Sequence, residues 1–229
     1  SAPQTGDRKM MGSTMQWYAF PRADAGTFPR PEELPWAMKV DKDYFIDRSS
    51  WAWWWETGLE IDNATEAELV RDNFLRAVFG NWAYLKNHLP KYANYRLDYL
   101  QHIAMKRESR RLLGDVILDE TDILERVEFP EWVTYCTHHK PLAKVDRYDV
   151  PYRVLYSRNI DNLFIGGRNM SVTHQALGTV RVQMTLGMAG EVTGMAAQIC
   201  KKHGVYPRAV YEMYLPELKK MMKRGAPLR

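Results

Sequence analysis

A pair of glycines after a short apolar run is the clearest chemical signal in the sequence. Residues 163–165 (LFI) predict a short strand, and Gly166, Gly167 and Arg168 follow it directly. Paired glycines let another group approach the main chain closely, because no Cβ stands in the way. Gly178 is then expected to open a turn into a helix, whose start presents unpaired N–H groups and a partial positive charge of about +0.5. Such a place suits a phosphate, a carboxylate or the electron-rich edge of a flavin.

The helix expected over residues 183–203 carries small residues on one face. Gly187, Gly190, Gly194 and Ala197 lie three, four and three residues apart, which places them on the same side. Each interior glycine costs about 0.5–1 kcal/mol relative to alanine, so three of them require a reason. Tight packing of the helix against a sheet and close approach of a flat ligand explain the spacing equally well.

The segment around these glycines resembles a known family. Residues 160–199 (IDNLFIGGRNMSVTHQALGTVRVQMTLGMAGEVTGMAAQI) are similar to the last FAD-binding segment of a family of bacterial FAD-dependent oxidoreductases, distantly similar to the fumarate reductase and succinate dehydrogenase flavoproteins. Further blocks that resemble the family are residues 51–58 (WAWWWETG), 81–87 (NWAYLKN), 106–123 (KRESRRLLGDVILDETDI) and 151–156 (PYRVLY). The resemblance implies an enzyme with FAD as cofactor. It would carry out flavin-mediated hydride transfer from a small polar organic substrate, for which a carbohydrate is one candidate.

The resemblance also assigns cofactor-binding roles. Gly167 and Arg168 match the loop that passes the ribityl chain, and the backbone amides of Val182 and Gln183 match those that face the pyrimidine edge of the isoalloxazine. Hydrogen-bond donors at that edge stabilise the negative charge of reduced flavin. Arg181 would add a full positive charge there, with a surface ion pair as the alternative.

Histidines and arginines are the candidates for substrate chemistry. His174 lies between the strand end and the helix start, where an imidazole would exchange a proton beside hydride transfer; a structural, hydrogen-bonded histidine is the alternative. His139 matches the histidine of a family Asp-x-His block, although Thr137 stands in place of the acid. Arg107 and Arg110 are expected to share a helical face and bind a substrate carboxylate or the flavin, or to lie on a solvated charged surface.

One family feature has no counterpart in the sequence. The GxGxxG turn between strand and helix, which cradles the cofactor's pyrophosphate, does not occur. The sequence therefore predicts an α/β fold in two parts: an α+β substrate or cap domain over residues 1–150, and the returning carboxyl-terminal strand–helix portion of a Rossmann-like FAD-binding domain over residues 151–229, without its amino-terminal half.

The missing motif also bears on cofactor affinity and partners. Alone, the chain is expected to bind FAD weakly or not at all, and the missing amino-terminal FAD-binding region or a complementary chain is the expected partner. The alternative is a catalytically incomplete fragment or subunit that acts as a substrate-binding or carbohydrate-binding module. Such a module would use the indole rings of Trp51, Trp53, Trp54 and Trp55, which packing under the substrate domain explains equally well.

Local patterns predict the main elements. Asn63 or Thr65 is expected to cap the first long helix, whose apolar stripe begins at Leu69. The predicted strands are residues 12–20, 115–118, 150–155 and 163–165, and the predicted helices are residues 63–87, 119–124, 183–203 with Gly204 as stop signal, and 209–224.

Composition excludes several classes of function. The 32 basic and 28 acidic residues are too balanced to predict a nucleic-acid partner. The two cysteines are isolated and show no CxxC spacing, so the sequence predicts no metal site. The sequence also contains no run of about 18–20 apolar residues, so it predicts no membrane span. Eight Trp and 13 Tyr favour an aromatic-rich core over an aromatic-lined pocket. The chain opens on Ser1 rather than Met, so its localisation stays open, as does its oligomeric state.

Overall fold

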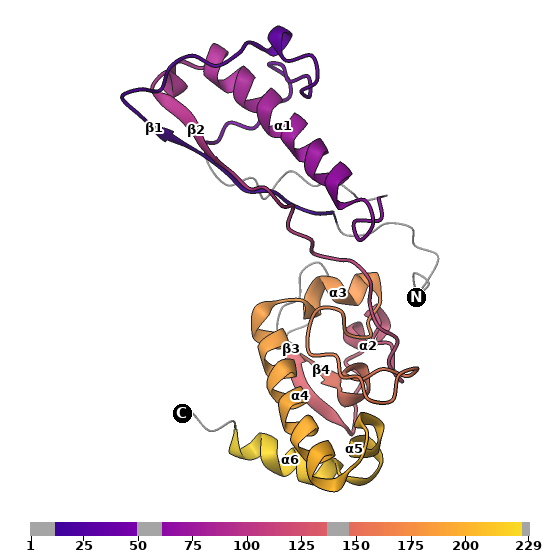
Figure 1. Ribbon diagram of the computed structural model, residues 1–229. Helices are drawn as coiled ribbons and strands as arrows, with labels where there is room; N and C mark the ends of the chain where they lie inside the picture. The colour runs from indigo at the N-terminus through magenta and orange to yellow at the C-terminus, as the bar shows by residue number, and fades with distance from the viewer. Residues whose placement is uncertain (1–11, 50–60, 137–146, 226–229) are drawn as a thin grey trace. The chain divides into compact units, whose positions relative to one another are not determined.

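The chain folds into two compact units. The computed structural model describes residues 12–49, 61–136 and 147–225; one unit is Lys9–Ser109 and the other contains Arg110–Arg229 (Figure 1). This division lies earlier in the chain than the boundary at residue 150 that the sequence predicts. The reason is that the segment after Arg110 bonds to later parts of the chain. The N–H of Leu112 donates to the carbonyl of Asn169 at 2.9 Å, and that of Leu118 donates to Ser171 at 3.0 Å.

The first unit packs one long helix against a two-stranded sheet. Its elements are β1 (Trp17–Pro21), the 3₁₀ turn η1 (Pro31–Glu33), α1 (Ala67–His88), the 3₁₀ turn η2 (Pro90–Tyr92) and β2 (Tyr95–Leu100). Strands β1 and β2 are antiparallel, with an irregular register between Tyr18 and Ala19. Trp17 from the sheet and Trp82 from the helix are both buried, and their ring centroids lie 6.2 Å apart. The expected aromatic core is therefore present in this unit.

Helix α1 forms where the sequence predicts a helix, but its start and its buried face differ in detail. Its N-cap is Glu66 rather than Asn63 or Thr65. Asn63 is buried instead, and its Nδ2 donates to the carbonyl of Glu108 at 2.7 Å. Val70 faces the core, whereas Leu69 is 48% exposed. The long-range hydrogen bond to Glu108 therefore holds Asn63 in a position other than the helix cap that its residue type favours locally.

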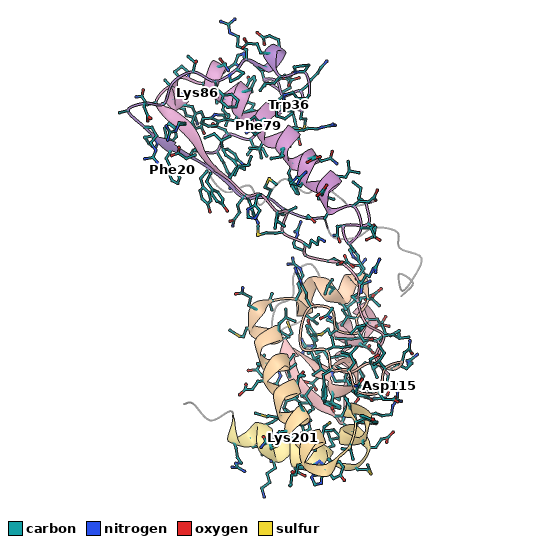
Figure 2. The ribbon with its side chains drawn as sticks, viewed as in Figure 1. Phe20, Trp36, Phe79, Lys86, Asp115 and Lys201 are labelled. Atoms are coloured by element: carbon teal, nitrogen blue, oxygen red, sulfur yellow. The ribbon has the colours of Figure 1, made fainter. Side chains whose placement is uncertain are left out.

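The outer side and the end of α1 are held by contacts from other segments. The ring centroids of Trp36 and Phe79, both labelled in Figure 2, lie 5.2 Å apart. At the last turn, Lys86 Nζ donates to the carbonyls of Ala93 and Tyr95, both at 2.7 Å. Burial lowers the pKa of Lys86. These bonds fasten the end of the helix to the start of β2.

The second unit is built around another long helix. Its elements are α2 (Glu120–Leu124), β3 (Trp132–Cys136), β4 (Tyr148–Pro151), the 3₁₀ turn η3 (Tyr152–Val154), α3 (His174–Val180), α4 (Gln183–His203), α5 (Pro207–Met213) and α6 (Leu215–Arg224). Strands β3 and β4 are antiparallel, and α4 packs against β3, α5 and α6. Val192, Ala196 and Ile199 carry the buried side of α4 into the core.

Several predicted elements of this unit are confirmed and others are shorter. Helix α4 has the predicted bounds, and Gly204 ends it with a left-handed φ of 66°. The strands expected at 115–118 and 163–165 are single bridges, Leu118 to Val172 and Tyr156 to Phe164. The strand expected at 150–155 ends at Pro151, where the chain turns into η3.

The expected last helix, residues 209–224, is two helices. Helix α5 ends at Met213 and α6 begins at Leu215. Pro216, at the second position of α6, has no N–H to bond back into the preceding turn, which favours a break at this point.

In the residues that the structure describes, six α-helices and two antiparallel two-stranded sheets make a mixed α/β protein, which confirms the fold class. Among those same residues, no helix combines the length and the apolar character that a membrane crossing requires.

Candidate functional site

The start of α4 exposes its backbone amides. Val182 is the N-cap in an extended conformation, and its side chain makes no capping hydrogen bond. Gln183 is exposed, and the side chain of Met184 follows at 76% exposure. The first-turn N–H groups of a helix have no partner inside the helix, and the helix dipole adds partial positive charge there. This surface can therefore donate hydrogen bonds to an electronegative group.

Within the described residues, the glycines of α4 are not required for tight packing. A Cβ added at Gly187 or Gly194 would meet no atom within 4 Å. A Cβ at Gly190 would lie 3.7 Å from the carbonyl oxygen of Gly166. The loop after residues 163–165 thus crosses the helix at Gly190 and leaves the face at Gly187 open. A distance of 3.7 Å is an ordinary van der Waals contact, so close packing within the described residues requires none of the three glycines.

The loop that crosses α4 has its own internal anchor. The carbonyl of Gly167 accepts the N–H of Met170 at 3.0 Å, and the N–H of Ser171 donates to the carbonyl of Val154 at 3.2 Å. Arg168 is exposed in this loop. The main chain at Gly166 and Gly167 is therefore held in place beside α4, which is the arrangement that the paired glycines predict.

Gly178 does not open a turn into the long helix. It is buried inside α3, which begins at His174 with Thr173 as N-cap. Thr173 Oγ1 accepts the N–H of Ala176 at 3.2 Å and donates to Glu120 Oε2 at 3.0 Å. The turn lies instead at Arg181 and Val182, the C-cap of α3 and the N-cap of α4. Thr173 caps a short additional helix here, which the glycine-rich pattern of the sequence does not indicate.

The other candidates do not all belong to one unit. Arg107 and Arg110 share no helical face, because residues 101–111 form no helix, and the two residues belong to different units. Arg107 Nε donates to the carbonyl of Gly12 at 2.9 Å. His174, the first residue of α3, is partly buried. His139, Thr137 and the tryptophans at 51, 53, 54 and 55 lie outside the described residues.

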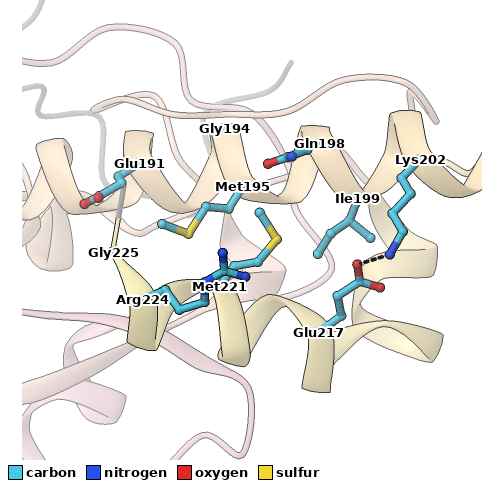
Figure 3. Close-up of a pocket in the computed structure, with 10 residues that line it drawn as sticks. All are labelled: Glu191, Gly194, Met195, Gln198, Ile199, Lys202, Glu217, Met221, Arg224 and Gly225. Atoms are coloured by element: carbon cyan, nitrogen blue, oxygen red, sulfur yellow. Dashed lines mark hydrogen bonds and ion pairs between the residues drawn. The ribbon is translucent and has the colours of Figure 1, made fainter. Parts of the chain in front are cut away.

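A pocket that sequence patterns do not indicate lies between α4 and α6. Its volume is 680 Å³, and Figure 3 shows Met195 and Met221 facing each other across it, with Glu217 and Lys202 at one end. Lys202 Nζ lies 2.8 Å from Glu217 Oε1, and His203 Nε2 lies 2.9 Å from Oε2. The hydrogen bond from Lys202, followed by that from His203, lowers the pKa of Glu217. This ion pair fastens the last turn of α4 to α6.

The described residues fit a flat, electronegative cofactor better than a metal. The open face at Gly187 leaves room for a ring beside the helix, and the uncapped first turn supplies donors for its edge. Within the described ranges, no group of three or more His, Cys, Asp or Glu side chains is placed to hold a metal ion.

Comparison with known proteins identifies the kind of site. A family model described as "FAD dependent oxidoreductase" matches residues 7–222, which include most of both compact units. Searches of curated proteins and of solved structures each found no match.

Proposed function

The chain belongs to the FAD dependent oxidoreductase family, and we propose that it supports flavin-mediated hydride transfer from a small polar organic substrate. FAD supplies the hydride-accepting chemistry when bound. The observation that carries the proposal is the open face of α4: Gly187 has no atom within 4 Å of a Cβ position, directly after an uncapped helix start. An ordinary buried helix has no need for such a face.

The start of α4 would hold the edge of the flavin ring. The amides at Val182 and Gln183 present hydrogen-bond donors where the pyrimidine part of the ring gains negative charge on reduction. Arg181, one residue earlier, would add positive charge to the same edge. Donors fixed on a helix need no reorganisation during the reaction, which is why such groups stabilise developing charge well.

The loop at Gly166 would hold the chain of the cofactor beyond the ring. Gly167 and Arg168 follow the point where this loop crosses α4 at Gly190, so the main chain there lies close to the proposed ring position. We assign the ribityl chain to this loop. His174, at the start of α3, is the side chain that we assign to proton exchange with the substrate.

We further propose that a separate strand–GxGxxG–helix segment supplies the pyrophosphate-binding part, because the sequence contains no such motif. It would belong to a missing amino-terminal FAD-binding region or to a complementary chain. The contribution of this chain is then to the isoalloxazine and the ribityl group, and its own affinity for flavin is weak.

Amide-resolved NMR with three titrants tests this assignment. Riboflavin and FAD should both shift the amides of Gln183, Met184 and Gly187 at similar, high concentrations, because the ring is the part that they share. Adenosine diphosphate, which carries the pyrophosphate without a flavin ring, serves as the control and should leave these amides unchanged. Shifts confined to other residues, or no shifts at millimolar riboflavin, would refute the proposal.

A further inference from the structure

The first unit contains a pocket of its own. It has a volume of 250 Å³ and is formed by three segments that are far apart in the sequence: the chain before β1, the start of α1 and the chain after β2. Its walls include Ser13, Asn63, Ala67, Val70, His102 and Ile103. All of these belong to Lys9–Ser109, so the pocket needs no contribution from the other unit.

Two walls of this pocket carry buried oxygens without a hydrogen-bond donor. Ser13 is 1% exposed and Asn63 is 0% exposed, and neither Ser13 Oγ nor Asn63 Oδ1 has a hydrogen-bond partner among the residues that the structure describes. Asn63 Nδ2 is already committed to the carbonyl of Glu108, which leaves Oδ1 as the acceptor. Buried polar atoms are nearly always paired, because burying one without a partner is costly. Such a pair beside a pocket therefore points to a ligand that brings donors.

The backbone holds both oxygens in fixed positions. Thr14 and Met105 exchange two main-chain hydrogen bonds, of 3.0 and 2.7 Å, directly after Ser13. Arg107 Nε donates to the carbonyl of Gly12 at 2.9 Å on the other side. Next to Asn63, Asp62 Oδ1 accepts the N–H of Ala64 at 2.9 Å. A site held in this way loses little conformational entropy when a ligand binds.

The rest of the lining selects the class of ligand. Val70, Ile103 and Ala104 offer apolar surface to C–H groups. Arg71 is paired with Asp72 at 2.7 Å, and Glu68 and Lys106 carry opposite charges, so the pocket does not favour a charged ligand. Hydroxyl groups on a C–H framework satisfy both requirements. We propose that this pocket binds a neutral polyhydroxylated small molecule whose hydroxyls donate to Asn63 Oδ1 and to Ser13 Oγ.

The test compares two serine variants of the full chain. Ser13→Ala removes one of the proposed ligand contacts. Ser171→Ala is the matched control, because Ser171 Oγ is equally buried and without a partner but lies in the other unit. Calorimetric titrations would use D-glucose, D-mannose and sorbitol as neutral probes, which separate ring sugars from linear polyols, and gluconate as the charged probe.

At least one neutral probe should bind the unaltered chain and the Ser171→Ala variant equally. Its affinity for Ser13→Ala should be about tenfold weaker, the effect of one lost hydrogen bond. Without probe, the Ser13→Ala variant should unfold at the same or a higher temperature than the unaltered chain, because the deleted oxygen has no donor. If Ser13 had a merely structural role, the variant would unfold at a lower temperature. The proposal is overturned if no neutral probe binds, if gluconate binds more tightly, or if Ser13→Ala retains full affinity. Riboflavin binding at α4 is measured separately, so the two proposals fail independently.

Discussion

The two long helices use glycine in opposite ways. Helix α1 contains one glycine, Gly80, and a Cβ there would lie 2.0 Å from the carbonyl oxygen of Met38. Helix α4 contains three, and at Gly187 and Gly194 a Cβ would meet nothing within 4 Å. The glycine of α1 is required by the fold of its own unit. The glycines of α4 lower helix stability, and no packing contact among the described residues requires them. This is typical of a surface kept clear for a ligand.

The largest effect is expected from Gly80→Ala. The new methyl group would overlap the main chain of Met38, whose N–H donates to the carbonyl of Arg76 and so cannot move away easily. Overpacking against backbone should lower the free energy of unfolding by about 3 kcal/mol. Urea unfolding monitored by tryptophan fluorescence measures this value. If the free energy of unfolding falls no more than it does for a substitution at an exposed glycine, Gly80 is not required by packing and the contrast between α1 and α4 fails.

Gly114→Ala should show that the second unit also contains a glycine required by packing. A Cβ at Gly114 would lie 2.6 Å from the carbonyl oxygen of Arg153 and 2.9 Å from Ser171 Cβ. We expect a loss of about 2 kcal/mol in the free energy of unfolding. Equilibrium unfolding with circular dichroism checks it. Unchanged stability would mean that the segment at Gly114 adapts.

Gly187→Ala should have the opposite sign. The site is helical and open, so alanine should raise the free energy of unfolding by about 0.5–1 kcal/mol through the lower conformational entropy of the unfolded chain. Gly194→Ala, in the same surroundings, is the matched variant and should give the same gain in a denaturant titration. Destabilisation by either change would show that the face of α4 is occupied by the protein itself.

The smallest effect is expected at the end of α4. This end is fastened to α6 by an ion pair, whereas the start of the helix is open. The bonds from Lys202 and His203 lower the pKa of Glu217 from 4.5, so their contribution to stability is present above that value and is lost as the pH falls through the lowered pKa. Glu217→Gln should therefore flatten the dependence of stability on pH in the acid range. Unfolding curves at a series of pH values measure the slope, and an unchanged slope would mean that the ion pair does not contribute. Because Glu217 is solvent-accessible, the effect should also shrink in high salt.

Local signals were enough to predict α4. Lys201, Lys202 and His203 fill its last turn, and Gly204 follows in the left-handed conformation that ends helices. The spacing of its glycines placed them on one face but did not decide between tight packing and an open face. Pro216 marks the break between α5 and α6 locally, but the amphipathic pattern runs across it and predicts one helix.

Long-range contacts were not predictable in the same way. Gly80 is a single glycine in a helix, and nothing near it indicates that Met38 lies against it. Asn63 has the side chain of a helix cap, yet Glu108 binds it and buries it. The pocket beside it depends on Ser13, which no local pattern places near Asn63. Each of these features is decided by partners distant in the sequence.

The flavin affinity of two leucine variants of α4 tests the central claim most directly. Gly187→Leu fills the open face near the helix start, and Gly194→Leu adds the same side chain about 10 Å further along the helix. Fluorescence titration with riboflavin should give binding at least about tenfold weaker for Gly187→Leu, and unchanged binding for Gly194→Leu, with both variants folded. If riboflavin binds Gly187→Leu as well as it binds the unaltered chain, the open face of α4 is not the flavin surface.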